Sequence, residues 1–380
     1  MRSDWKKTTI DEVCARIYSG GTPSTKETAY WNGDINWLSS GETRNNFIYE
    51  TERKITKLGV EQSSTQLAFR DSIVIATAGQ GYTRGQASFL KIDTYVNQSI
   101  LVLEADRTMV EPLFLYYNLS NRYEELRQLS DGTSTRGGLS GWIVRRMTIK
   151  LPPIDIQKKI IDVLYAIDQK IECNIAINKN LEEQVSAIYQ AWFEDFSCSD
   201  GIRPYEWTMC PLADIADVTS GKRPPVKSTY QTKETPIPIL GASSIMGFTS
   251  AENYSDHILV IGRVGTHGIV QRFNGSCWAS DNTLGIRSKF YEYVNQILQR
   301  VDYHSMNRGS TQPLITQSDI KNVAVLLPDH TTLSKFEKIV ASLMAVYESN
   351  LLESTKLIVL RDTLLPRLMS GEFDVSDIEL

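Results

Sequence analysis

Residues 153–195 read PIDIQKKIIDVLYAIDQKIECNIAINKNLEEQVSAIYQAWFED, and apolar side chains recur along this stretch at steps of four and three. The positions in step are Ile160, Leu164, Ile167, Ile171, Asn174, Asn178, Leu181, Val185, Ile188 and Trp192. A period of 3.5 residues with eight of ten positions apolar is the a/d pattern of a coiled coil. The stretch therefore predicts a helix of about 40 residues, roughly 60 Å long.

The same phase returns in residues 329–371, 176 positions later. The matching residues are Phe336, Val340, Leu343, Tyr347, Asn350, Ser354, Leu357, Arg361, Leu364 and Leu368. One amphipathic helix would indicate only a buried face, whereas two with the same phase, length and central polar gap predict helices that pack antiparallel on each other. Asn174 and Asn350 would then meet at mid-length, where a hydrogen bond between their amides would fix the register at some cost in stability.

Pro366 and Gly371 predict where the second helix stops. Proline removes a backbone donor and clashes with the preceding turn, so we expect the helix to kink or end near Thr363. Gly371 is the expected C-cap, and residues 373–380 are expected to form a loose tail.

The composition, 41% hydrophobic and 22% charged over 380 residues, is that of a soluble protein of two or three domains. No apolar run is long enough to cross a membrane, and the start of the chain lacks a signal-peptide core. Five scattered cysteines predict reduced thiols in the cytoplasm, and with four scattered histidines they indicate no metal site. The net charge of −5 divides unevenly: 1–152 and 203–328 carry +2 each, 153–202 carries −5 and 329–380 carries −4. Basic globules could lie on phosphate, unlike acidic helices, although so small an asymmetry decides nothing alone.

Residues 1–152 and 197–328 are expected to be α/β globules that precede the two helices. In the first, strands are predicted at 35–38, 73–76, 86–90, 100–103 and 147–151, with a helix over 111–128. In the second, strands are predicted at 237–240, 258–261, 268–273 and 283–287, with a helix near 290–303. The predicted fold class is α+β: two α/β domains separated by two long antiparallel helices that form a coiled-coil spacer, a tandem duplication with pseudo-twofold symmetry.

Two Gly-rich loops, 77–86 and 262–268, each follow a strand and lead into another strand. A phosphate-binding fingerprint needs a helix after the glycines, so neither loop indicates a nucleotide site. One interpretation is two turns without further function. The other is a pair of loops close to DNA, because glycine lets backbone approach phosphate while Arg, Gln, Thr and His reach base edges.

A second matched pair, 132–138 and 308–312, combines small hydroxyl residues with Arg136 or Gln312. Such residues suit phosphate and base contacts, and they suit a strand-entry turn equally well. Catalysis has no support, because the chain has neither the Asn/Asp-Pro-Pro-aromatic motif of an amino-methyltransferase nor a Gly-x-x-x-x-Gly-Lys-Ser/Thr loop.

The order of these features resembles the specificity subunit of a type I restriction–modification system, over the whole chain. Leu-Pro-Pro-x-x-x-Gln-Lys-Lys-Ile at 151–160 opens the first helix, and Leu-Leu-Pro-Arg-Leu-Met-Ser-Gly-Glu at 364–372 closes the second. Trp5 and Trp207 begin the two halves, and Ser-Gly-x-x-Pro follows at 19–23 and 220–224. The second helix departs from the pattern, since Asp329 follows Leu-Pro where a second proline is usual.

The resemblance implies that 1–152 and 197–328 are target-recognition domains, each reading one half of a bipartite site in double-stranded DNA. It implies that 153–196 and 329–372 are spacer helices that dock two methylation subunits. Those subunits would bind S-adenosylmethionine, a restriction subunit can join them, and this chain would hold no catalytic residue. The DNA contacts we favour are Gln80, Tyr82, Thr83, Arg84, Arg136, Lys222, Arg223, Arg263, Thr266, His267 and Gln312.

Two other functions remain open on the residues alone. A scaffold that binds only protein would show no affinity for DNA. A nuclease or methylase built from scattered residues would be active as a purified chain.

Overall fold

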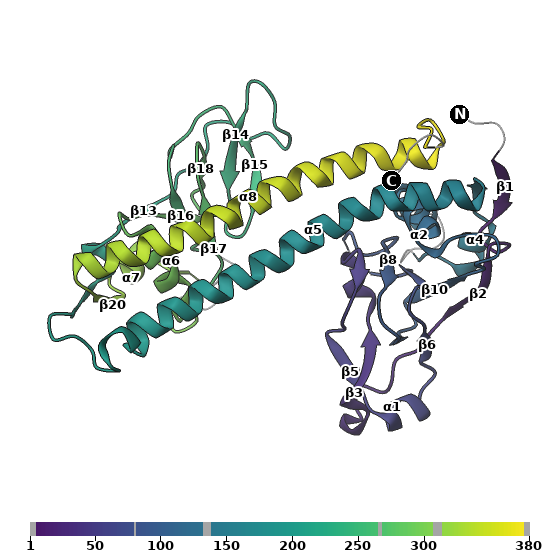
Figure 1. The fold of residues 1–380 in the computed structure, drawn as a ribbon, viewed down its shortest axis with the longest axis horizontal. Coiled ribbons are helices and arrows are strands. Elements are labelled where there is room, and N and C mark those ends of the chain that lie inside the picture. The colour runs from purple at the N-terminus through teal and green to yellow at the C-terminus, as the bar shows by residue number, and fades with distance from the viewer. Residues whose placement is uncertain (1–4, 80, 132–137, 265–267, 307–313, 376–380) are drawn as a thin grey trace. The chain divides into compact units, whose positions relative to one another are not determined.

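The structure is a computed structural model that describes residues 5–79, 81–131, 138–264, 268–306 and 314–375. It forms two compact units: the first is Met1–Cys173 with Glu353–Leu380, and the second is Asn174–Leu352. The division passes through both long helices, so each unit holds one globule and part of each helix (Figure 1). The predicted segments divide the chain differently because they count each helix as a separate piece.

Short strands and short helices build both globules, and one long helix follows each globule. The strands of the first unit are β1 (Lys6–Thr9), β2 (Cys14–Ser19), β3 (Trp31–Leu38), β4 (Phe47–Ile48), β5 (Arg53–Ile55), β6 (Gln66–Ala68), β7 (Ile73–Ala76), β8 (Ala87–Leu90), β9 (Thr94–Val96), β10 (Ile100–Ala105) and β11 (Thr148–Leu151). Its short helices are α1 (Lys57–Glu61), α2 (Pro112–Ser120), α3 (Tyr123–Asp131) and α4 (Gly141–Arg146). The strands of the second unit are β12 (Thr208–Pro211), β13 (Asp217–Ser220), β14 (Ile237–Leu240), β15 (Ile245–Thr249), β16 (Ile258–Gly262), β17 (Val270–Phe273), β18 (Trp278–Ala279), β19 (Thr283–Arg287) and β20 (Ala324–Leu327), and its short helices are α6 (Tyr291–Arg300) and α7 (Gln317–Lys321). The two long helices are α5 (Ile154–Tyr189) and α8 (His330–Met369).

Both units use the same sheet plan. The main sheet has the order β2-β10-β7-β8-β4 in the first unit and β13-β19-β16-β17 in the second. A smaller sheet contains a short parallel pair in each unit, β3 with β9 and β14 with β18. A separate antiparallel pair, β1 with β11 and β12 with β20, joins the start of each globule to the strand before its long helix. The duplication therefore extends through the whole globule, although the sequence repeats only at its edges.

Each predicted strand corresponds to an observed one, and the predicted helix near 290–303 corresponds to α6. The predicted helix over 111–128 is wrong as a single element, because it breaks into α2 and α3. Arg122 lies at the break and donates to the backbone oxygen of Thr148, while α2 is buried on most of its surface and α3 is amphipathic. The break therefore separates a helix that is buried from a helix that has one face in solvent.

Helix α8 runs through Pro366 to Met369, so it does not end near Thr363. Leu365, Leu368 and Met369 are buried in the core of the first unit. Burial of such side chains stabilises by roughly 1.5–3 kcal/mol each, which offsets the hydrogen bond that proline removes.

The helix ends as predicted at Gly371, which has φ +70°. The Gly371 N–H donates to Leu368 O (3.2 Å) and the Glu372 N–H donates to Arg367 O (3.0 Å). These two bonds form a Schellman motif, whose left-handed position favours glycine. A Cβ at Gly371 would lie 3.1 Å from the ring of Trp5, so the cap also packs closely on the start of the chain.

Within each unit, the contacts between α5 and α8 are antiparallel. In the first unit Arg361 Nη1 lies 2.9 Å from Asp168 Oδ1, and Lys170 Nζ lies 3.1 Å from Glu353 Oε2. Tyr117 Oη also donates to Asp168 Oδ2 (2.7 Å), so a buried carboxylate joins α2 to both long helices. In the second unit the asparagines supply the corresponding polar contacts.

Those asparagines pair differently from the prediction. Asn350 Nδ2 donates to Oδ1 of Asn178 (2.9 Å), while Asn174 Nδ2 donates to the backbone oxygen of Asn350 (3.5 Å). Asn178, one turn after Asn174 on α5, therefore supplies the acceptor for the Asn350 amide. Asn178 Nδ2 also donates to Tyr347 O (3.1 Å).

We expect Asn174→Leu to leave the free energy of unfolding unchanged or to raise it, and to loosen the register. Leucine suits a buried seam position, whereas a buried amide fixes register at a cost. Asn178→Leu is the matched control. It leaves the Asn350 amide without its acceptor and should lower the free energy of unfolding by about 1–3 kcal/mol. Urea unfolding measures the free energy of unfolding, and hydrogen exchange of the helix amides measures how firmly the register is held. A lower urea midpoint for Asn174→Leu would contradict the account.

A side chain from the start of each long helix holds the helix that covers the main sheet. Gln157, on α5 and fully buried, accepts the Glu111 N–H (2.9 Å) at the start of α2. Glu337, on α8, accepts the N–H groups of Glu292 (3.1 Å) and Tyr293 (2.8 Å) at the start of α6. Free N–H groups at a helix start need such acceptors, so each globule is fixed to the long helix that follows it.

No helix in the described part of the chain is long and apolar enough to cross a membrane. The cysteines whose thiols are described, Cys14, Cys173, Cys210 and Cys277, are all free.

Candidate nucleic-acid interface

The Ser-Gly turn and the Gly-rich loop meet at one end of the main sheet in the first unit. Ser19, the last residue of β2, pairs with Leu101, while Ile100 pairs with Ala76, the last residue of β7. The turn after Ser19 and the loop after Ala76 therefore leave the sheet together. Leu139, which follows the predicted 132–138 segment, donates its N–H to Thr77 O (2.8 Å). The Ser-Gly turn and the two predicted loops thus start or end at this edge, which we call the loop edge of the first unit.

The second unit has a loop edge built in the same way. Ser220, the last residue of β13, pairs with Leu284, and Gly262, the last residue of β16, pairs with Thr283. Ile315, which follows the predicted 308–312 segment, donates its N–H to Arg263 O (2.9 Å). Segments far apart in the sequence therefore converge on equivalent ends of the two sheets.

Several backbone hydrogen bonds of the two loop edges occur at equivalent positions. Gly21 N–H donates to Val96 O as Lys222 N–H donates to Ala279 O, both at 3.0 Å. Further matched bonds are Thr77 N to Ser99 O (2.8 Å) and Arg263 N to Asn282 O (2.9 Å). Equivalent backbone positions therefore carry different side chains: Gly21 and Lys222, Thr77 and Arg263, Ser99 and Asn282.

A glycine is required where each Ser-Gly turn crosses the sheet. A Cβ on Gly20 would lie 1.9 Å from Val96 O, and a Cβ on Gly221 would lie 2.0 Å from Ser280 O. Both atoms belong to backbone and cannot rotate away. The turn can take this path only with hydrogen at that position.

The Gly-rich loop of the first unit is held on α3. Tyr123 Oη donates to Tyr82 O (3.1 Å), and Arg127 Nη1 donates to Gly81 O (2.7 Å). The Tyr82 side chain is 81% exposed, and Thr83 is half-buried. Tyr82 therefore presents a large planar side chain at the loop edge from a fixed backbone.

The prediction of Arg84 as a direct DNA contact does not agree with its position. Its side chain is only 9% exposed, and its guanidinium forms an ion pair with Asp131 of α3. Burial of the arginine stem favours this internal pair over a contact with an external phosphate. Arg84 holds the loop and is not at its surface.

In the second unit Lys222 and Arg223 are exposed, and Arg263 is half-buried. The remaining predicted contacts, Gln80, Arg136, Thr266, His267 and Gln312, lie outside the described residues.

The sequence reasoning missed residues that the fold adds to the loop edge. Ser99 and Asn282, just before β10 and β19, have no local motif and reach the edge only through sheet pairing. Gln317 was also missed: its Nε2 donates to Val218 O (2.6 Å), and its Oε1 accepts from Ser220 Oγ (3.3 Å). The cap pattern Thr316-x-x-Asp319 could have placed Gln317 at a helix start.

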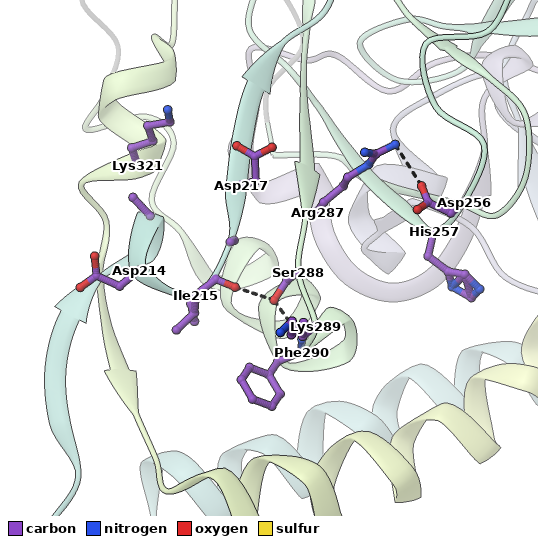
Figure 2. Close-up of a pocket in the computed structure, with 12 residues that line it drawn as sticks. Asp214, Ile215, Asp217, Asp256, His257, Arg287, Ser288, Lys289, Phe290 and Lys321 are labelled. Carbon is purple, nitrogen blue, oxygen red and sulfur yellow. Dashed lines mark hydrogen bonds and ion pairs between the residues drawn. The ribbon is translucent and has the colours of Figure 1, made fainter.

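A cleft of about 760 Å³ lies at the opposite end of the second unit's main sheet, where β13 begins and β19 ends. Figure 2 shows Asp256 paired with Arg287 (3.1 Å) and Ser288 donating to Ile215 O (2.7 Å). Asp214 and Asp217 also line the cleft. Its three carboxylates are balanced by Arg287, Lys289 and Lys321, so the cleft carries no excess of positive charge for a phosphate backbone. It lies at the other end of the sheet and does not extend the loop edge.

Nucleophilic chemistry is not favoured at the buried thiols. Burial raises the pKa of Cys14 and of Cys277 to about 12, so both are protonated at neutral pH. Within the described residues no cluster of His, Cys, Asp and Glu has metal-binding geometry.

Two copies of one globule, each with a loop edge and a following long helix, define a duplicated recognition protein. The model of the type I restriction modification DNA specificity domain matches residues 2–183 and 204–361. The chain belongs to this family, whose members are the non-catalytic subunits that supply DNA sequence recognition in type I restriction–modification complexes.

Relatives and a solved structure agree over nearly the full length. The chain is 25% identical to the type I restriction enzyme MjaIX specificity subunit of Methanocaldococcus jannaschii, with 99% of this chain and 95% of the relative covered. It is 22% identical to the HindI specificity subunit of Haemophilus influenzae, with 97% and 100% covered. A crystal structure of the type I S subunit from M. genitalium has the same fold, with a TM-score of 0.63, 18% identity and coverage of 97% and 96%.

Proposed function

We propose that each globule reads one half of a bipartite site in double-stranded DNA through its loop edge. The observation that carries the proposal is the hydrogen-bond frame shared by the two edges, on which equivalent positions bear different side chains. A fixed frame places side chains at a constant distance from the duplex, and the side chains then decide which bases are accepted. Two different edges imply two different half-sites.

We propose further that the long helices dock two methylation subunits, which bind S-adenosylmethionine, and that a restriction subunit can join this complex in the cytoplasm. Large apolar side chains are exposed on these helices in both units. They include Ile175, Val346, Leu351 and Leu352 in the second unit, and Ile358, Val359 and Leu360 in the first. Exposed apolar residues gathered on helices indicate a protein-binding surface.

The test is co-expression with a methylation subunit from the same genome, followed by genome-wide mapping of N6-methyladenine. We expect one bipartite motif methylated in both halves. A stable complex without methylation would contradict the proposed reading of DNA, and the absence of any complex would favour a scaffold of another kind. Methylation by the chain alone would show that it is an enzyme.

Tyr82→Ala is expected to change one half of that motif only. Tyr82 is exposed and its backbone carries the loop's contacts, so its side chain can be removed without loss of folding. Loss of a base contact costs about 1–3 kcal/mol, roughly a 5- to 150-fold fall in methylation rate at limiting enzyme. Tyr205, which is 99% exposed and lies outside the loop edge, is the matched control for Tyr→Ala. An equal fall in the methylation rate at both halves of the motif would contradict the proposal that Tyr82 helps to recognise one half-site.

A further inference from the structure

The loop that follows the Ser-Gly turn of the second unit carries a high density of positive charge. Residues 222–233, KRPPVKSTYQTK, hold four cations and no carboxylate, and we call them the basic loop. The cations are Lys222, Arg223, Lys227 and Lys233, all exposed. Within the described part of the chain, none of these four side chains forms an ion pair. Their charge is therefore available to an external partner.

The basic loop is ordered by its own hydrogen bonds and by β15. Ser228 and Phe248 exchange both backbone bonds at 2.8 Å, which adds the loop to the edge of the smaller sheet. Thr235 N–H donates to Thr232 Oγ1 (3.1 Å), and Gln231 Nε2 donates to Pro236 O (3.0 Å). A loop fixed in this way loses little conformational entropy on binding.

Apolar side chains are exposed beside these cations. Tyr230 is 78% exposed, Val226 and Ile245 are each 51% exposed, and Met246 is 41% exposed. Val226 and Tyr230 belong to the basic loop, and Ile245 and Met246 begin β15, which pairs with it. Hydroxyl, aromatic and cationic groups together suit a nucleic-acid surface.

The surface is continuous with the loop edge. The Lys222 N–H donates to Ala279 O, and the Ser280 N–H donates to Leu240 O, so the basic loop and the end of β14 both adjoin the end of β18. Gln271 Nε2 donates to Gly241 O (2.6 Å), which ties the β14–β15 turn to β17. A duplex lying on the loop edge therefore passes next to the basic loop.

The corresponding segment of the first unit lacks this charge. The whole segment between β13 and β14, residues 221–236, holds four cations and one carboxylate, Glu234. In the first unit the segment between β2 and β3, residues 20–30, contains one cation, Lys26, and one carboxylate, Glu27. The two segments therefore differ in the electrostatic attraction that they can offer to a phosphate backbone.

We propose that the basic loop, with the exposed start of β15, is a second DNA contact that grips the duplex beside the half-site read by the second domain. Its cations lie on phosphates, and Tyr230 lies against sugars or base edges. The second domain thus anchors the complex on DNA of any sequence, while the first domain contributes mainly reading. This inference rests on the proposed function, since it takes DNA at the loop edge as given.

The test uses the complex that this chain forms with its methylation subunits. It measures how strongly DNA binding by that complex depends on salt concentration, in the unaltered protein and in variants. The probe is a duplex that carries the mapped site, and a duplex without it is measured in parallel. For Lys227→Gln/Lys233→Gln we expect the slope of log K against log salt to become shallower by about 1.8, roughly 0.9 per phosphate contact. The change should appear on both duplexes. Lys289→Gln/Lys321→Gln is the control, because it removes the same charge at the cleft shown in Figure 2.

Three results would overturn the proposal. An unchanged slope in the basic-loop variant, with normal binding by the unaltered complex, would overturn this inference alone. Loss of complex assembly in that variant would assign the loop to a protein partner. If the unaltered complex bound neither duplex, the proposed function would fail together with the inference. Tyr230→Ala should weaken binding without a change of slope, which separates the apolar contact from the charge.

Discussion

Gly20→Ala is expected to abolish methylation of the half-site read by the first domain, and Gly221→Ala to abolish that of the second. Each new Cβ would lie within about 2 Å of a backbone oxygen, Val96 O or Ser280 O. Overpacking costs about 1–3 kcal/mol where neighbours can move, and we expect about 3 kcal/mol or more here because backbone must move. The displaced turn carries Gly21 or Lys222 out of the shared hydrogen-bond frame.

The measurement is methylation of each half-site by complexes that carry one variant at a time, together with hydrogen exchange of the sheet amides. Gly41→Ala is the control in the first unit, because the nearest atom to its Cβ would be Ser39 Oγ at 3.8 Å. We expect Gly41→Ala to retain both activities. Equal activity of Gly20→Ala and Gly41→Ala would show that the turn does not position the loop edge.

Arg361→Met is expected to destabilise the first unit by about 3–5 kcal/mol. This is the usual cost of leaving one member of a buried ion pair without its partner. Asp168 is 4% exposed and would lose its cation, although Tyr117 would still donate to it. Methionine keeps much of the packing of the arginine's aliphatic stem. The loss of stability therefore measures mainly the cost of the Asp168 carboxylate without its cation. Addition of Asp168→Asn should recover part of the stability, because it removes that charge.

Hydrogen exchange of the α2 amides at increasing urea measures this effect within the first unit. Lys170→Met is the matched control on the same helix pair. Lys170 and Glu353 are each about half exposed, and an exposed pair contributes about 0–1 kcal/mol. A similar loss in both variants would indicate that the contact between Arg361 and Asp168 has no special role.

The periodic features of the fold could be predicted from the sequence because they repeat over many residues. The seam of α5 and α8 spans ten positions, and strands such as β7 are continuous apolar runs. Strands that were not predicted are β1, β2, β4, β5, β6, β9, β12, β13, β15, β18 and β20. All of them except the six-residue β2 are two to five residues long, so an alternation has little room to appear. The expected end of α8 near Thr363 was wrong because the packing of Leu365 and Leu368, which keeps the helix intact through Pro366, is a tertiary effect.

The loop edge could be predicted only as a set of separate loops. Glycine and hydroxyl residues marked 77–86 and 262–268 as turns between strands, and the structure confirms that position. Their convergence with the Ser-Gly turns depends on strand order, which no local motif records. Arg84 shows the limit most clearly, because an arginine in a Gly-rich loop has the same sequence pattern whether it faces DNA or Asp131.

The division of the chain into units has a consequence for biosynthesis. The second unit is one continuous segment, Asn174–Leu352, whereas the core of the first unit combines Trp5 and Ile160 with Leu368 and Val375. Domains generally fold as units during synthesis once their residues have emerged. The N-terminal globule leaves the ribosome first, yet its core is completed last, when the end of α8 arrives. A ribosome that stalls in α8 would therefore release a chain whose defect lies in the globule made earliest.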